Sequence, residues 1–144
     1  MFGIIVGTHG QFAPGIVQSC EMIFGKRDKL KAVTLMPGEG PDDVVEKYKQ
    51  AIAELGTEKI LIFNDLMGGS PYNAACRLVA ENENYGIVAG VNLPGLIAMS
   101  AAQDTDDGSA TIAEIMAQAL DACKDGAVIS SYESLNVESD DDEL

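Results

Sequence analysis

Short apolar runs alternate with longer helical patterns along this chain, and this alternation limits its fold more than any other feature. One run, Ile60–Phe63, is apolar at every position, as in a strand that is covered on both faces. Further strands are expected at about Phe2–Val6, Lys31–Leu35 and Gly86–Val91. Helices are expected at about Phe12–Phe24, Pro41–Leu55, Pro71–Val79, Pro94–Ala102 and Ala110–Lys124, with Ser70 capping the third of them. The pattern predicts an α/β domain with an open, doubly wound, mainly parallel sheet and helices on both faces.

The last apolar segment, Ala127–Tyr132, does not fit a simple parallel arrangement. It follows the fifth expected helix after only Asp125 and Gly126. A connection this short predicts that the segment either runs antiparallel at an edge of the sheet or reaches across to a second subunit.

The charge is strongly acidic, at -14 with 23 acidic and nine basic residues. A nucleic-acid-binding surface needs a basic patch, so a role on nucleic acid is not expected. Part of the acidity lies in the run "ESDDDEL" at the carboxyl end. Runs of like charge repel one another, which predicts one domain over residues 1–132 and a disordered acidic tail over residues 133–144.

The cysteines Cys20, Cys76 and Cys123 are too widely spaced for a disulfide framework, and one histidine cannot complete a Cys/His zinc site. We expect buried thiols, no metal and no cofactor. No apolar run approaches the roughly 18 residues of a membrane span, and the amino terminus lacks the basic segment of a secretory leader. These features predict a cytoplasmic protein.

The only histidine, His9, follows the first apolar run, and Asp65 follows the third. In the common strand order 2-1-3-4, these two strands are neighbours at the switch point, where α/β sheets bind ligands. A carboxylate that accepts a hydrogen bond from one ring nitrogen fixes the tautomer and leaves the other nitrogen nucleophilic. The sequence therefore predicts His9 as a nucleophile that Asp65 orients.

The stretch Gly68-Gly69-Ser70 stands where a helix begins, and backbone N–H groups at such a place bind anions. We expect these residues to hold a phosphoryl group on His9, with the Ser70 hydroxyl as a further donor. Thr8, Gly10 and Asn92 are candidates for the rim of the same site. The loops that follow the four expected strands, "GTHGQ", "MPGEG", "NDLMGGSP" and "NLPG", contain no lysine or arginine, and neutral donors suit a group that must be passed on. Neither a GxGxxG nor a GxxxxGK[ST] nucleotide loop is present.

These motifs resemble those of the IIA domains in the mannose-type (mannose/fructose/sorbose) branch of the bacterial sugar phosphotransferase system. The resemblance rests on "GIIVGTHGQFAPG", "MPGE", "FNDLMGGSPYNAA" and "VAGVNLPGL", which occur in the same order over about residues 2–130. It implies a homodimer that exchanges the final strand, which would account for Ala127–Tyr132. One departure is Leu66, where relatives often have threonine, so a hydroxyl contact to phosphate is not carried over.

The resemblance also implies a function. The histidine matching His9 accepts a phosphoryl group, on Nε2, from the phosphocarrier protein HPr. It passes the group to a IIB protein or domain, which phosphorylates the sugar as the membrane components IIC and IID import it. The chain would then be a phosphotransferase, although its sequence does not name the sugar.

Two other functions remain open at this point. Similar domains pass phosphate to a dihydroxyacetone kinase, although many of them continue into further carrier domains. A different class is a non-catalytic, ligand-binding regulatory module on a flavodoxin-like fold, which would need no nucleophile.

Overall fold

The computed structural model describes residues 1–142, and its elements follow the expected alternation of strands and helices. The strands are β1 (Gly3–His9), β2 (Leu30–Leu35), β3 (Ile60–Asn64) and β4 (Tyr85–Ala89). The helices are α1 (Phe12–Phe24), α2 (Pro41–Leu55), α3 (Gly69–Val79), α4 (Leu93–Thr105), α5 (Ile112–Asp125) and α6 (Tyr132–Asp142). No helix within residues 1–142 combines the length and the apolar character needed to cross a membrane.

The four strands form one parallel sheet in the order β2-β1-β3-β4, which confirms the predicted order. The central strands β1 and β3 lie side by side with Gly7 opposite Asn64. Because the strands are parallel, their carboxyl ends meet at one edge of the sheet, and His9 and Asp65 both lie at that edge.

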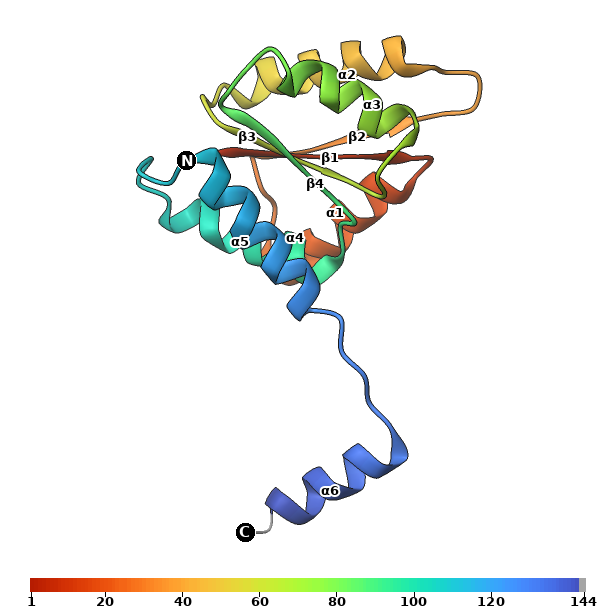
Figure 1. Ribbon diagram of the computed structural model, residues 1–144, viewed down its shortest axis with the longest axis vertical. Coiled ribbons are helices and arrows are strands. Elements are labelled where there is room, and N and C mark those ends of the chain that lie inside the picture. Colours follow the sequence, from red (N-terminus) through yellow and green to blue (C-terminus); the bar gives the residue numbers. More distant parts are fainter. Residues whose placement is uncertain (143–144) are drawn as a thin grey trace.

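Helices cover both faces of the sheet, as predicted. In Figure 1, α2 and α3 lie above the sheet, while α1, α4 and α5 lie below it. Side chains of β3 alternate between the two layers: Leu61 and Phe63 pack into the core beneath α1, α4 and α5, whereas Ile60 and Ile62 pack beneath α2 and α3. All four are fully buried, so the two-sided apolar pattern reflects two cores on one strand.

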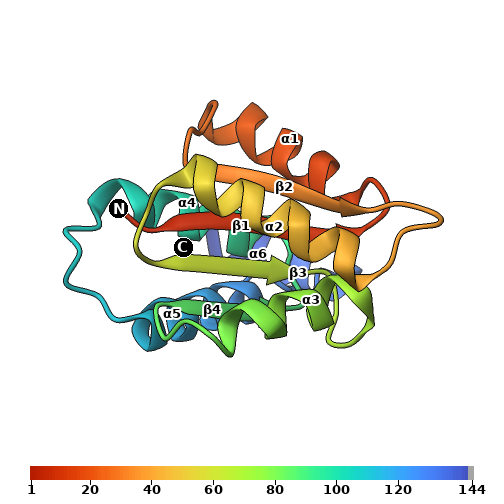
Figure 2. The same cartoon turned by 90° about the horizontal axis from the view of Figure 1, so that it is seen from above.

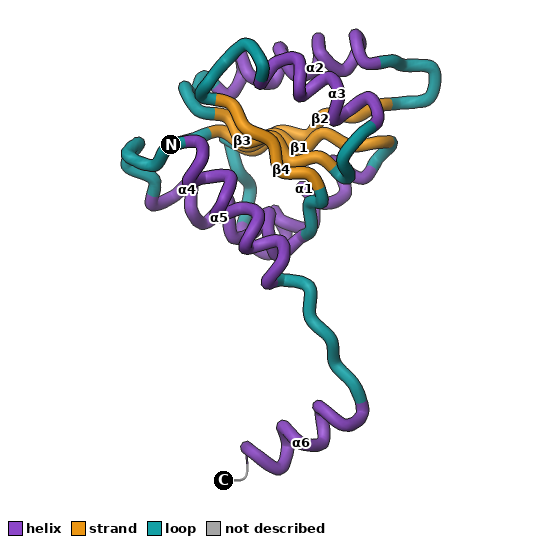
Figure 3. The backbone as a smooth tube through the Cα atoms, in the orientation of Figure 1, coloured by secondary structure: helices purple, strands orange, loops and turns teal. Residues whose placement is uncertain are grey.

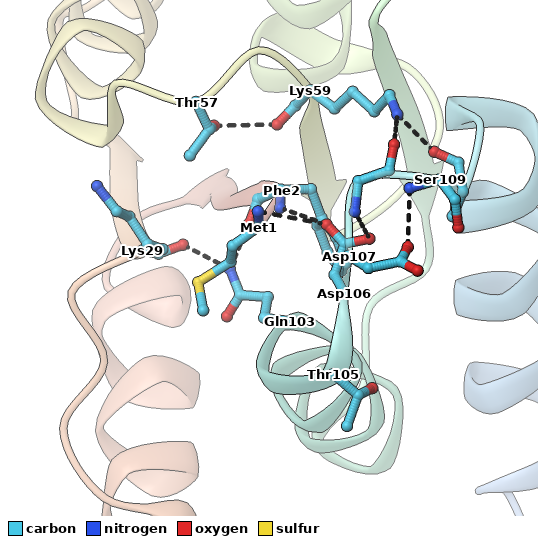
Figure 4. Close-up of polar contacts among 12 residues, drawn as sticks. Met1, Phe2, Lys29, Thr57, Lys59, Gln103, Thr105, Asp106, Asp107 and Ser109 are labelled. Carbon is cyan, nitrogen blue, oxygen red and sulfur yellow. Dashed lines mark hydrogen bonds and ion pairs between the residues drawn. The ribbon is translucent and has the colours of Figure 1, made fainter.

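Polar contacts join the amino-terminal ends of the strands to the end of α4 and to the loop that follows it (Figure 4). The carboxylate of Asp106 accepts a hydrogen bond of 3.1 Å from the Phe2 amide. The Gln103 amide nitrogen donates to the carbonyls of Phe2 and Lys29, at 2.9 Å each. The Lys59 ammonium donates to two loop carbonyls at 3.0 and 2.6 Å. These bonds fix the edge of the sheet opposite to His9.

The expected strand over Ala127–Tyr132 is not part of the sheet in the single chain. Residues 127–131 are an extended connection between α5 and α6, visible as the long loop in Figures 1 and 3. Whether this segment pairs with a second subunit stays a prediction.

Helix α6 occupies Tyr132–Asp142, where the sequence predicts a disordered acidic tail over residues 133–144. Reciprocal hydrogen bonds begin this helix, because the amide of Ser131 donates to the Ser134 hydroxyl and the amide of Ser134 donates to the Ser131 hydroxyl. The last two residues of the predicted tail, 143–144, lie outside the described part of the chain.

Gly7 is required by close packing rather than by an unusual backbone angle. A Cβ atom at Gly7 would overlap the phenol of Tyr48. We expect Gly7→Ala to lower the free energy of unfolding by about 1–3 kcal/mol, because it overpacks a fully buried site. Urea unfolding followed by circular dichroism measures this change.

Gly15→Ala is the matched control, because a Cβ there would meet no atom within 4 Å and Gly15 lies inside α1. It should raise the free energy of unfolding by up to about 1 kcal/mol. The two substitutions are expected to change stability in opposite directions, so a Gly7→Ala protein as stable as Gly15→Ala would rule out the close approach of Tyr48.

Candidate functional site

His9 is the last residue of β1 and stands where the sheet opens to solvent, with its side chain 47% exposed. The turn that follows it is held by buried Thr8, whose hydroxyl accepts a 2.7 Å hydrogen bond from the amide of Ala13 at the start of α1. Gly10 adopts a φ of 56°, a left-handed angle that favours glycine. The imidazole is therefore presented on a fixed turn while its outer edge remains accessible.

The Asp65 carboxylate lies behind the His9 ring, as the sequence predicts. Its Oδ2 atom lies 2.7 Å from Nδ1 of the ring and also accepts a 3.1 Å hydrogen bond from the His9 amide. The second oxygen, Oδ1, accepts a 3.0 Å bond from the amide of Leu66. Because an ionised carboxylate only accepts hydrogen bonds, Nδ1 carries the proton of the neutral ring, and Nε2 of that tautomer has a free lone pair.

The environment of Asp65 favours the ionised form. Burial alone would raise the pKa of this carboxyl, whose side chain is only 12% exposed. Hydrogen bonds from the His9 ring, the His9 amide and the Leu66 amide outweigh burial and hold the pKa of Asp65 below its ordinary value. The carboxylate is therefore charged at neutral pH and accepts the hydrogen bond from Nδ1.

The amino end of α3 lies against the free nitrogen of His9. A Cβ atom at Gly69 would lie 3.0 Å from Cε1 and 3.1 Å from Nε2 of the ring, so a side chain there would crowd the exposed nitrogen. Gly68 and Gly69 have φ angles of 94° and 77°, which only glycine adopts readily. The turn thus brings the first N–H groups of a helix to the accessible side of the imidazole.

Ser70 has a different local role from the predicted one. The helix begins one residue earlier, at Gly69, with Gly68 at the capping position and no side-chain cap. Ser70 is therefore inside the first turn, and its hydroxyl makes no hydrogen bond within residues 1–142. The expectation that it caps α3 is wrong, because the two left-handed glycines already end the loop, and its hydroxyl stays available to a ligand.

The three rim candidates do not line the site as a group. Thr8 is fully buried and its hydroxyl serves the turn before α1. Asn92 caps α4 by accepting from the Gly95 amide at 2.9 Å and donates to the Cys123 carbonyl at 2.7 Å, so its polar atoms are engaged. Gly10 shapes the turn through its backbone and its amide donates to the Leu35 carbonyl at 2.8 Å.

Large apolar side chains next to His9 and next to Asp65 in the sequence are exposed to solvent. Leu66 and Met67, which follow Asp65, are 51% and 77% exposed, and Phe12 at the start of α1 is 46% exposed. Within residues 1–142, no three His, Cys, Asp or Glu side chains converge on a point where a metal ion could bind.

Two buried polar residues next to the site were not predicted to contribute to it. Asn64 precedes Asp65, and Tyr48 comes from α2; both are fully buried and hydrogen-bonded to each other at 3.0 Å. The Oδ1 atom of Asn64 has no hydrogen-bond partner within the described chain. An unpaired buried acceptor costs about 1–3 kcal/mol, so stability alone does not explain this asparagine. The sequence signal that could have indicated this role is Asn64 itself, because it is a polar residue at the end of an otherwise apolar strand.

Comparison with known proteins assigns the chain to a family. Residues 3–116 match the model of the EIIA-man family, described as the PTS system fructose IIA component, where PTS stands for the sugar phosphotransferase system. This match covers the whole sheet and both His9 and Asp65.

Individual relatives agree with this match. A fructose-specific EIIA component of Bacillus subtilis is 41% identical over 98 residues, which are 67% of each chain. A mannose-specific EIIAB component of Escherichia coli strain K12 is 36% identical over 124 residues, which are 85% of this chain. The chain matches only 38% of the length of that E. coli protein.

Solved structures show the same fold. The IIA protein associated with the fucose utilization operon of Streptococcus pneumoniae matches with a TM-score of 0.73 at 29% identity, over 94% of this chain and 96% of that one. The EIIA component of Streptococcus agalactiae matches with a TM-score of 0.80 at 24% identity, over 90% and 97% of the two chains. With a family model that spans most of the sequence and relatives that share it, the chain belongs to the mannose-type IIA family of the sugar phosphotransferase system.

Proposed function

We propose that this protein is a phosphoryl carrier of a sugar phosphotransferase system. His9 accepts a phosphoryl group from phospho-HPr on Nε2 and passes it to a IIB component. The observation that carries this proposal is the 2.7 Å contact between Nδ1 and Asp65, which leaves the Nε2 lone pair of the neutral, half-exposed ring free to attack. This role places the chain in the cytoplasm, with the membrane components IIC and IID acting after IIB.

The transfer needs no group beyond the two proteins that exchange phosphate. The Nε2 lone pair attacks phosphorus and forms an N–P bond, while the bond from phosphorus to the donor breaks and its electron pair leaves with the donor. In the second step the N–P bond breaks, and its electrons return to Nε2 as the acceptor nucleophile binds phosphorus. The proton on Nδ1 stays shared with Asp65 throughout, which stabilises the positive charge on the phosphorylated ring.

The start of α3 is the proposed phosphate site. Gly68, Gly69 and Ser70 contribute backbone N–H groups and one hydroxyl beside Nε2, and the helix dipole favours an anion there. Because no lysine or arginine occurs between His9 and Phe12 or between Asp65 and Pro71, the phosphoryl group is held by neutral donors. Such a site binds phosphate without trapping it.

The proposed donor and acceptor are proteins, which agrees with the open setting of the ring. Phe12, Leu66 and Met67 provide exposed apolar surface in the elements that carry the site. A protein partner that covers them would exclude water from the transferring group and limit its loss by hydrolysis.

Sugar phosphotransfer is favoured over the other two functions. Relatives of this chain are named as mannose-, fructose- and sorbose-specific PTS components, whereas a dihydroxyacetone kinase donor has no support among them. A regulatory module without catalysis leaves the contact between His9 and Asp65 unexplained.

A reconstituted phosphotransfer assay tests the proposal. The protein is incubated with phosphoenolpyruvate, enzyme I and HPr, and acid-labile phosphate on the chain is measured before and after addition of a IIB protein. Phosphate should appear on the chain and then move to IIB, while a dihydroxyacetone kinase added instead should leave it in place. A chain that never acquires phosphate would show the proposal to be wrong.

We also infer that the protein is a homodimer in which residues 127–131 add an antiparallel strand to the partner. In the single chain, Val128 and Ile129 are 81% and 95% exposed, and β4 is an edge strand with an unpaired side. Exposed apolar side chains and the unpaired backbone of an edge strand both favour pairing with another segment. Exchange of this segment between two copies would bury the side chains and pair the edge strand.

Light scattering should therefore give about twice the chain mass of 15.2 kDa. A variant that ends at Gly126 lacks the exchanged segment and should give the mass of a monomer. A monomeric full-length chain at working concentration would contradict strand exchange.

A further inference from the structure

A chain of buried hydrogen bonds connects the three elements that carry the proposed site. The side-chain amide of Asn64 in β3 donates to the Gly7 carbonyl of β1 at 2.8 Å and to the Tyr48 hydroxyl at 3.0 Å. The Tyr48 hydroxyl, from α2, donates in turn to the Pro71 carbonyl in the first turn of α3 at 2.8 Å. All four residues are buried.

Three residues of this hydrogen-bond network lie close in sequence to residues of the site. Gly7 precedes His9 by two residues, Asn64 directly precedes Asp65, and Pro71 follows Gly69 by two residues. The bonds therefore fix three distances at once: between the two strands, and from each strand to the amino end of α3. Hydrophobic packing alone would leave α3 free to slide along the sheet by small amounts, because apolar contacts have no preferred direction.

The close packing of Tyr48 on β1 makes the connection rigid. The phenol lies so near the backbone of Gly7 that even a methyl group there would overlap it. Burial raises the pKa of Tyr48, so its hydroxyl stays protonated and keeps donating to the Pro71 carbonyl at any pH at which the protein works.

We propose that Tyr48 and Asn64 are positioning residues for phosphoryl transfer: they hold the first turn of α3 at a fixed distance from Nε2 of His9. This inference rests on the proposed function, since it concerns the same site. Neither residue touches the phosphoryl group. They act through the backbone of α3, whose first N–H groups must meet the transferring oxygens in the transition state, where small displacements are costly.

Tyr48→Phe tests the inference, because it removes one hydroxyl and keeps the buried ring. Tyr85→Phe is the matched control. Tyr85 is the first residue of β4, at the end of the sheet opposite to His9, and its hydroxyl makes no hydrogen bond within residues 1–142. We expect the transfer rate constant at saturating phospho-HPr to fall roughly 10-fold in Tyr48→Phe, with the KM for phospho-HPr within about two-fold of wild type. Tyr85→Phe should keep both values.

Two further measurements separate positioning from general loss of structure. In ¹⁵N NMR spectra, the amide signals of Gly69 and Ser70 should shift in Tyr48→Phe and stay in place in Tyr85→Phe. Asn64→Leu should slow transfer in the same way, and the double variant should be about as slow as the slower single variant, because both substitutions break one network.

The outcomes distinguish the two proposals. If wild-type protein is never phosphorylated, the proposed function is wrong and this inference falls with it. If wild type is phosphorylated on His9 and Tyr48→Phe transfers as fast as Tyr85→Phe, the carrier function stands and the positioning role is wrong. A Tyr48→Phe defect that appears only as a raised KM would also contradict positioning.

Discussion

His9→Ala should abolish phosphoryl uptake, with the rate at least about 10³-fold below that of wild type. The chain has only one imidazole, so no other side chain can form a phosphohistidine. The fold should survive, because the ring is half exposed and contributes little to the buried core. Radioactive phosphoenolpyruvate with enzyme I and HPr, followed by acid treatment, measures the uptake.

Gln11→Ala is the control for this experiment, since Gln11 is an exposed residue of the same loop. It should take up phosphate as wild type does. Acid-labile phosphate on His9→Ala would place the nucleophile elsewhere. His9→Gln keeps the polarity of the side chain and should also be inactive; a fully functional His9→Gln protein in cells would instead favour the regulatory module.

Asp65→Ala should fold but transfer phosphate roughly 10²-fold more slowly. Without the carboxylate, the ring loses the bond that fixes its orientation, and the tautomer that carries hydrogen on Nε2 becomes populated. The attacking lone pair is then missing in part of the molecules and badly aimed in the rest. Rapid-quench measurement of transfer from phospho-HPr gives the rate constant.

Asp121→Ala serves as the matched control, because Asp121 is an exposed carboxylate on α5. Its rate should equal that of wild type. An Asp65→Ala protein with an unchanged rate would show that the carboxylate does not orient His9.

The lowered pKa of Asp65 also sets a pH limit for this contact. A carboxyl whose pKa is lower in the folded than in the unfolded protein stabilises the fold fully above its ordinary pKa of about 3.9. That stabilisation is lost as the pH falls through the lowered value. Asp65 therefore remains charged down to about pH 4, and it should cause no loss of transfer rate between neutral pH and that limit.

Much of the fold followed from local patterns. The run Ile60–Phe63 indicated a strand between two layers because side chains alternate across a strand, and both sets were apolar. The bounds of α1 and α2 agree with the prediction because their apolar stripes end at Gly25 and Gly56, where the helices end. The proximity of His9 and Asp65 followed from strand order alone, since neighbouring parallel strands end together.

Other features depended on contacts that no local pattern records. Ser70 looked like a helix cap, but the left-handed angles of Gly68 and Gly69 start α3 before it. Tyr48 lies inside the helix expected at Pro41–Leu55, yet its hydrogen bonds reach residues 16 and 23 positions away. The apolar segment after α5 reads as a strand, although the sheet of a single chain gives it no partner.

The sequence by itself determined the order of the elements, the identity of the one possible phosphohistidine and the edge of the sheet where it stands. These depend on periodicity and chain order, which act over a few residues or follow from parallel strands. Only the tertiary structure decided the 2.7 Å contact with Asp65, the place of Gly69 beside Nε2 and the buried network through Tyr48 and Asn64. Such distances arise when separate elements pack together, because directional hydrogen bonds then select one arrangement among many that would bury the same apolar surface.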